Sequence, residues 1–147
     1  MIDNAIDWTN GDETKKRIEK FLQDMDNEFV PSLGSRVDIP QYASKLARLA
    51  ETVFIMEHSK ADIASCSIYC NQSNAYISSI AVKKQYQGQG VGSMLIKEVV
   101  RHVKGKCKAI VLHVHRANKE AIYYYRKNGF RENSASRDWI EMIYSMR

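Results

Sequence analysis

The sequence predicts one domain of the mixed α/β (α+β) class, with a mostly antiparallel central sheet of about six to seven strands flanked by about four helices. Apolar residues recur at helical spacing in some segments and form short strand-like runs in others. No repeat, low-complexity segment or long Pro/Gly/Ser-rich linker divides the chain. Its 147 residues can bury a core without a disulfide or a metal. We therefore expect a single domain over residues 1–147.

Two helices are expected in the N-terminal part. From Thr14 the sequence TKKRIEKFLQDMDNEF carries apolar residues at i, i+3, i+4, i+7 and i+11, the stripe of an amphipathic helix. The segment PSLGSRVDIPQ is typical of a loop. The following run, IPQYASKLARLA, favours a second helix that places Tyr42, Leu46 and Leu49 on one side.

Three strand-like runs follow, TVFIMEH, IASCSIYC and AYISSIAV, and turn-forming residues separate them, so neighbouring runs are expected to pair as antiparallel hairpins. A helix from the glycine-rich segment to about Lys104 is expected to expose Lys97, Glu98 and Arg101. The remaining predicted elements are a strand at AIVLHV, a helix from Asn118 to Asn128, and two hairpin-paired strands around Phe130 and DWIEMIYSM.

Composition and charge exclude several function classes. No apolar run approaches the roughly 20 residues of a membrane-spanning helix, and MIDNAIDWTN carries acids where a signal peptide would be basic. We therefore expect a cytoplasmic protein with no membrane partner. The net charge of +5 suits an anionic cofactor as well as a nucleic acid. Because the basic residues are dispersed and no basic-aromatic platform occurs, no nucleic-acid partner is expected.

The cysteines predict neither a disulfide framework nor a metal site. Cys66, Cys70 and Cys107 are too few for a framework, and Cys66 and Cys70 in one strand would lie about 13 Å apart. No CxxC or HExxH spacing occurs, so no metal is expected. We interpret the three residues as reduced core thiols.

The segment QGQGVG, from Gln87 to Gly92, lies between a β-branched strand end and a strongly helical pattern. Glycines let the backbone approach a phosphate, and the first-turn amides of a helix lack partners and point the same way. The segment therefore predicts a pyrophosphate-binding loop. A Walker loop would need a lysine before Ser93, and a Rossmann fingerprint would need an acid where the next strand ends in HVH. A tight connection without a ligand remains the alternative.

This loop resembles motif A of the GCN5-related N-acetyltransferase (GNAT) superfamily, Gln/Arg-x-x-Gly-x-Gly/Ala, which Gln87, Gly90 and Gly92 match. A second match begins at Gln85, but we prefer the first because Val82 then lies five residues ahead of the glutamine. The resemblance implies a GNAT-like fold with acetyl-CoA (coenzyme A) as co-substrate. It implies pyrophosphate contacts from Gln87, Gly88, Gln89, Gly90, Val91, Gly92 and Ser93, and pantetheine contacts from Ile80, Ala81 and Val82.

A second segment, NKEAIYYYRKNGF from Asn118 to Phe130, resembles motif B of the same superfamily. Its asparagine, alanine, tyrosine and Gly-Phe match in register, which singles out Tyr125 among three consecutive tyrosines. The resemblance implies that Tyr125 protonates the leaving thiolate and that Asn118 contacts the cofactor. Taken alone, Asn118 is equally an N-cap and Tyr125 a core residue.

The resemblance implies an N-acetyltransferase, an acyltransferase that moves acetyl to a primary amine of a small molecule or peptide by direct attack in a ternary complex. Many relatives carry a glutamate base on the fourth or fifth strand; here His113 is the candidate, because an imidazole titrates near neutrality. Glu51, Glu57 and water remain alternatives for the base. An acyl-CoA-binding regulatory module without turnover is the alternative function, and a homodimer stays open.

Overall fold

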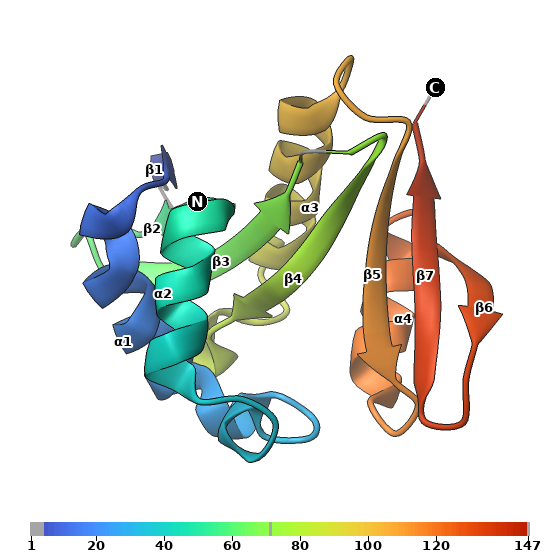
Figure 1. The fold of residues 1–147 in the computed structure, drawn as a ribbon, viewed down its shortest axis with the longest axis horizontal. Coiled ribbons are helices and arrows are strands. Elements are labelled where there is room, and N and C mark those ends of the chain that lie inside the picture. Colours follow the sequence, from blue (N-terminus) through green and yellow to red (C-terminus); the bar gives the residue numbers. More distant parts are fainter. Residues whose placement is uncertain (1–4, 71, 147) are drawn as a thin grey trace.

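The computed structural model describes residues 5–70 and 72–146. Within them one seven-stranded sheet has the order β1-β2-β3-β4-β5-β7-β6 (Figure 1). All described pairings are antiparallel except the parallel pair of β4 with β5. This confirms the predicted mostly antiparallel sheet and its hairpins. The strands are β1 Ala5–Thr9, β2 Glu51–Met56, β3 Asp62–Tyr69, β4 Asn74–Val82, β5 Ala109–His115, β6 Arg131–Ala135 and β7 Trp139–Ser145.

In the described part of the chain four α-helices cover both faces of this sheet, as predicted. They are α1 Lys15–Met25, α2 Ile39–Leu49, α3 Val91–Val103 and α4 Lys119–Lys127. Because side chains alternate along a strand, Phe54 of β2 joins the core under α1 and α2, whereas Val53 and Ile55 join the core under α3 and α4. Figure 1 shows the two helix pairs on opposite sides of the strands. In the part of the chain that is described, no helix combines the length and the apolar character needed to cross a membrane.

The parallel pairing of β4 with β5 is short, and the two strands separate beyond it. Only three registered pairs join these strands, from Asn74↔Ala109 to Tyr76↔Val111. Beyond them β4 continues to Val82 and β5 to His115, and Figure 1 shows the two strands diverging into a wedge. The facing strand edges therefore have no sheet partner there, although buried backbone groups require hydrogen-bond partners.

The sequence pattern gave no indication of β1 and placed one helical residue wrongly. Strand β1 pairs antiparallel with β2 at the edge of the sheet. Leu49, expected on the same side of α2 as Leu46, is 56% exposed, whereas Leu46 is buried. The buried face of α2 is centred on Ile39, Ala43 and Leu46, and Leu49 lies about 80° from Ile39 around the helix. Leu49 therefore lies at the margin of the buried face of α2.

Strand β1 also explains a buried acid that the pattern assigned to the surface. Trp8 of β1 donates its indole N–H to Glu98 Oε2 at 2.6 Å, and Arg101 Nε donates to Glu98 Oε1 at 2.9 Å. Trp8 also stacks on His102 at 3.7 Å between ring centroids, and His102 contacts Glu51 at 2.8 Å. The expected exposure of Glu98 was wrong because Trp8, from a strand that the pattern missed, covers this side of α3.

We predict that Glu98→Gln destabilises the protein by roughly 1 to 3 kcal/mol at neutral pH, because it weakens charge-assisted hydrogen bonds to a buried carboxylate. The hydrogen bond from Arg101, and further the one from Trp8, lowers the pKa of Glu98. A lowered folded-state pKa stabilises the protein above the unfolded-state pKa, and this contribution disappears as pH falls through the folded-state value. The difference between wild type and variant, measured by urea unfolding, should therefore shrink in acid.

The matched control is Glu132→Gln, which removes an exposed pair with Arg126. Exposed ion pairs contribute about 0 to 1 kcal/mol. Equal destabilisation by the two substitutions at neutral pH would contradict the role assigned to Glu98.

Candidate active site

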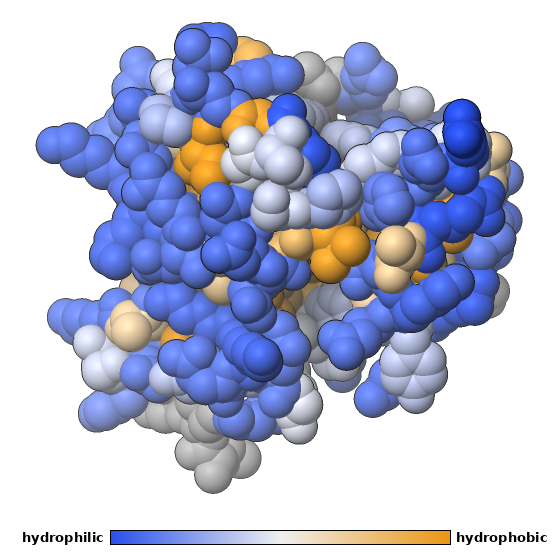
Figure 2. All heavy atoms as spheres, turned by 90° about the horizontal axis from the view of Figure 1, so that it is seen from below, coloured by the Kyte–Doolittle hydropathy of each residue, from blue (hydrophilic) through white to orange (hydrophobic). Residues whose placement is uncertain are grey.

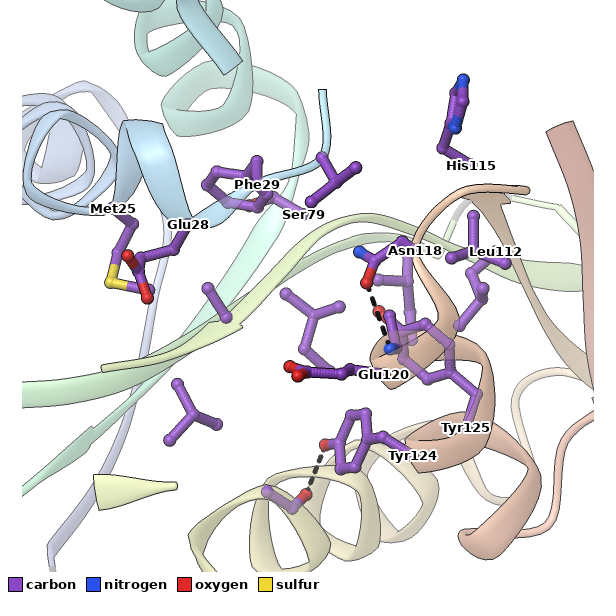
Figure 3. A pocket seen from close by; sticks show the side chains of 18 of the residues that line it. Met25, Glu28, Phe29, Ser79, Leu112, His115, Asn118, Glu120, Tyr124 and Tyr125 are labelled. Atoms are coloured by element: carbon purple, nitrogen blue, oxygen red, sulfur yellow. Dashed lines mark hydrogen bonds between the residues drawn. The ribbon is translucent and has the colours of Figure 1, made fainter. Parts of the chain in front are cut away.

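A cavity of about 620 Å³ occupies the wedge between β4 and β5. Its walls come from β4, β5, the N-terminus of α3, one side of α4 and the segment between α1 and α2. In Figure 3, Met25, Glu28 and Phe29 lie on one side of the cavity and Asn118, Tyr124 and Tyr125 on the other. Figure 2 views the molecule from the open end of the wedge and shows apolar surface between hydrophilic regions.

The glycine loop forms one end of this cavity. Gly88 and Gly90 have φ of 78° and 84°, in the left-handed region that favours glycine, and Gly90 is the N-cap of α3. No side chain caps the helix. The amides of its first turn are therefore available to a ligand, and the helix dipole adds roughly half a positive charge there. The loop has the backbone conformation that an anion site requires.

The structure brings most, though not all, of the sequence-predicted loop residues to the cavity. Gln89 is exposed, and its side-chain amide donates to Gln85 O at 2.9 Å. Val91 is buried in the core. Neither side chain lines the cavity, so a ligand contact from either would have to come from its backbone. The predicted residues that do line it are Ile80, Ala81, Val82, Gln87, Gly88, Gly90, Gly92, Ser93, His113, Asn118 and Tyr125.

Tyr124 is a site residue that the sequence reasoning missed. Its hydroxyl donates to Gly92 O at 2.6 Å, shown as a dashed line in Figure 3. A Cβ on Gly92 would lie 2.7 Å from Tyr124 Cε1, so the ring and the helix backbone are in direct contact. Tyr124 thus fixes α4 against the first turn of α3. Three consecutive tyrosines were the only sequence signal, and the motif register assigned a role to one of them.

The β4 wall of the cavity contains a β-bulge. Ser67 pairs with Ser79 and Ile68 pairs with Ile77, which leaves Ser78 as the extra residue. The Tyr42 hydroxyl donates to Ser78 O at 3.0 Å, so α2 holds the bulge in place. Burial, more than any neighbouring charge, raises the pKa of Tyr42 to about 12, so its hydroxyl stays protonated and can keep donating.

Tyr125 lies inside the cavity wall. It is 8% exposed and packs against Phe130, with ring centroids 5.8 Å apart. No described residue makes a hydrogen bond to its hydroxyl. Burial, and then the neighbouring Cys66, raises the pKa of Tyr125 above its ordinary value. The hydroxyl is therefore neutral and able to donate a proton or a hydrogen bond to a group in the cavity.

Asn118 caps α4 as its N-terminal position suggested. Its Oδ1 accepts a hydrogen bond from Ala121 N at 3.2 Å, and the residue also lines the cavity. The capping interpretation of Asn118 is confirmed. A ligand contact from the same side chain stays a prediction.

His113 reaches the cavity from the other face of β5. Its neighbours Leu112 and Val114 point into the core under α3 and α4, so His113 points toward the α1 and α2 side. Its Nδ1 lies 2.9 Å from the Tyr76 hydroxyl, and its Nε2 lies 3.5 Å from Glu141 Oε2. The imidazole, with a side chain 44% exposed, is thus oriented by two partners and still open to the cavity.

Other candidate bases lie elsewhere. The Glu51 carboxylate contacts His102 Nε2 at 2.8 Å, and Glu57 accepts hydrogen bonds from Tyr86 and Ser59. Neither carboxylate is among the cavity-lining residues. Among the described residues, no group of three or more His, Cys, Asp or Glu side chains could hold a metal ion.

Residues 18–130 match the family model described as Acetyltransferase (GNAT) family. The chain belongs to this family. Its fold agrees: the crystal structure of Arabidopsis thaliana NAA60 in complex with acetyl-CoA superimposes with a TM-score of 0.76 at 18% identity, over 97% of this chain and 98% of that one. The resemblance stated from the two motifs is thereby confirmed.

Two relatives are more similar in sequence over a shorter stretch. N-alpha-acetyltransferase 60 of Danio rerio is 32% identical over 90 residues, which is 58% of this chain and 36% of that protein. Thialysine N-epsilon-acetyltransferase of Sus scrofa is 37% identical over 67 residues, 45% of this chain and 39% of that protein. The matched part of the GNAT chain thus spans little more than a third of each relative.

We predict that Gly90→Asp abolishes acetyl-CoA binding, because a carboxylate at the N-cap of α3 repels phosphate and its side chain fills the loop. Isothermal titration calorimetry measures the loss. Gly105→Asp is the matched control: φ is 83° there against 84° at Gly90, and a Cβ meets no atom within 4 Å at either position. Both variants carry the same backbone strain, so unchanged affinity in Gly90→Asp, or equal loss in Gly105→Asp, would contradict the placement.

Proposed function

We propose that this GNAT-family chain is an acetyl-CoA-dependent N-acetyltransferase that transfers acetyl to a primary amine by direct attack in a ternary complex. One observation carries the proposal: a single cavity joins the amide-rich N-terminus of α3 to Tyr125 on one face of the sheet and His113 on the other. An anionic acyl carrier and an amine could thus enter from opposite sides and meet in the wedge. Direct transfer requires that both substrates be bound together.

The residues present fit coenzyme A. Positive-φ glycines and uncapped first-turn amides suit a pyrophosphate, which carries negative charge and many acceptor oxygens. The β4 edge from Ile80 to Val82 has no strand partner on the β5 side, so it can hydrogen-bond the amides of an extended pantetheine arm. When bound, acetyl-CoA supplies an acetyl group already activated as a thioester.

The chain must then remove a proton from the amine. A lysine-like amine has a pKa near 10.4 and is mostly protonated at neutral pH, so it needs a base. His113 lines the cavity and is flanked by Tyr76 and by the carboxylate of Glu141, which would stabilise the imidazolium formed on proton uptake. We assign the base to His113, acting directly or through a water.

Tyr125 is suited to donate a proton, whereas His113 accepts one. Its side chain is mostly buried, and its neutral hydroxyl has no described hydrogen-bond partner, so it can protonate or hydrogen-bond the departing sulfur. The geometry also favours direct attack over a cysteine acyl-enzyme. Cys66 is fully buried, burial raises its pKa, and none of the three cysteines lines the cavity.

The acceptor is a primary amine of a peptide or a small molecule. Its end of the cavity is bounded by Phe29, Val30 and Trp139, with Arg36 over the Trp139 ring at 5.5 Å and Glu28 nearby on the lining. Two relatives cited above are named as an N-alpha-acetyltransferase and a thialysine N-epsilon-acetyltransferase. These names are compatible with either a peptide or a small-molecule acceptor. We expect the reaction to take place in the cytoplasm.

The first test is release of free CoA thiol from acetyl-CoA across a panel of peptide and small amines, with mass spectrometry of the products. Tyr125→Phe should lower turnover roughly 100-fold while acetyl-CoA still raises the Tm, since only the acid is removed. Stabilisation by acetyl-CoA without thiol release for any amine would instead support an acyl-CoA-binding module. Equal loss of turnover and affinity in Tyr125→Phe would remove the acid assignment.

We predict that His113→Ala lowers kcat/KM roughly 100-fold and flattens its rise with pH through the range in which imidazoles titrate. The measurement is a pH profile of kcat/KM with the best amine of the panel. His58→Ala is the control, because His58 is an exposed residue outside the cavity. A profile in His113→Ala that keeps its wild-type shape would point to water or to another group as the base.

A further inference from the structure

Two thiols meet outside the cavity. Cys70 directly follows β3, and Cys107 lies between α3 and β5. Their Sγ atoms are 3.3 Å apart, although 37 positions separate them in the chain. Cys107 is 8% exposed, whereas Cys70 is partly exposed and open to a reagent. Cys66 and Cys70 are neighbours in the sequence, but the fold brings a different pair of cysteines together.

The two thiols lie next to the point where the pairing of β4 with β5 begins. Cys107 lies just ahead of Lys108, whose N–H donates to Ser73 O at 2.8 Å. The registered pairs of β4 with β5 begin immediately afterwards, at Asn74↔Ala109. The thiols therefore lie at the closed end of the wedge that Figure 1 shows between these strands. A bond between them would join the two halves of the sheet where few backbone hydrogen bonds do so.

We propose that Cys70 and Cys107 are a reversible modification site, at which a small disulfide oxidant such as oxidised glutathione converts the two thiols into a disulfide across the closed end of the wedge. The sulfur atoms must approach by about 1.3 Å to reach the S–S length of about 2.05 Å.

The reaction balances as two thiol–disulfide exchanges. The Cys70 thiolate attacks one sulfur of oxidised glutathione and forms a mixed disulfide, and one glutathione thiolate leaves. The Cys107 thiolate then attacks Cys70 Sγ and displaces the second glutathione. The two cysteines lose two electrons and two protons in total, and oxidised glutathione is reduced to two glutathione molecules. Excess dithiol reverses both steps.

The site is expected to stay reduced until the oxidant is present. Burial, together with the neighbouring Cys107 thiol, raises the pKa of Cys70 to about 11, and thiolates rather than thiols are the nucleophiles. The exchange should therefore be slow near neutral pH. This inference does not depend on acetyl transfer, because neither thiol lines the cavity.

The test uses the reduced full chain, incubated for hours with oxidised glutathione at about pH 8 to raise the thiolate fraction. The chain is then unfolded, alkylated, digested and mapped by mass spectrometry. We expect a cross-linked peptide that joins Cys70 to Cys107 and lacks two hydrogen atoms, with Cys66 alkylated. Because the cross-link closes a long loop of the unfolded chain, the Tm should rise by about 5 to 10 °C and return after reduction with dithiothreitol.

Cys70→Ser and Cys107→Ser are the controls, and neither should show the rise in Tm after the oxidant. A stable mixed disulfide on Cys70, a cross-link that involves Cys66, or three freely alkylated cysteines would each overturn the proposal. The peptide map is made on the wild-type chain, so it decides the question even where a serine variant folds poorly. Acetyl-CoA binding is measured separately, so none of these outcomes decides for or against the proposed function.

Discussion

The early end of the hydrogen bonding between β4 and β5 is the constraint on which the rest of the structure depends. Three residue pairs hold the parallel strands together, and past Tyr76 and Val111 they separate. An open sheet would ordinarily continue this ladder, because unpaired buried backbone groups are costly. The opened strands leave a slot through the sheet with a free β4 edge. A ligand with amide groups can supply the missing partners, which is why the cavity lies there.

The slot is held open by contacts from both sides. On one side, the Tyr42 hydroxyl holds the bulge at Ser78 and so connects α2 to β4. On the other side, Tyr124 connects α4 to Gly92 at the start of α3. The helix that carries Tyr125 is therefore fixed directly to the helix whose first turn forms the anion end. The glycine loop and the proposed acid cannot move far apart without breaking that contact.

Burial separates the chemical roles of the groups around the slot. Tyr125 is enclosed by the core and kept neutral, which suits an acid. His113 is in contact with solvent and with Tyr76 and Glu141, which suits a base that must take up and release a proton. The proposed base is thus an imidazole that has a carboxylate beside it. Two different faces of the sheet bring these groups to one cavity.

The local features of the fold could be predicted from the sequence. Helical periodicity located α1 to α4 to within a few residues, alternating and apolar runs located β2 to β5, and the glycine-rich segment located the loop that precedes α3. Two short motifs with a fixed separation were enough to indicate the GNAT family, and the family match agrees. These signals depend on residues close together in the chain, so one sequence contains them in full.

What depends on distant residues was decided only by the tertiary structure. The pattern missed β1, and with it the burial of Glu98, because Trp8 and Glu98 are 90 positions apart. Likewise Tyr124 against Gly92, Glu141 beside His113, and Cys70 beside Cys107 are pairs that no local spacing encodes. Periodicity tells which face of an element is apolar, whereas contact partners follow from how the faces pack in three dimensions. The sequence by itself therefore determined the elements other than β1 and the position of the glycine loop, and packing determined which side chains meet around the cavity.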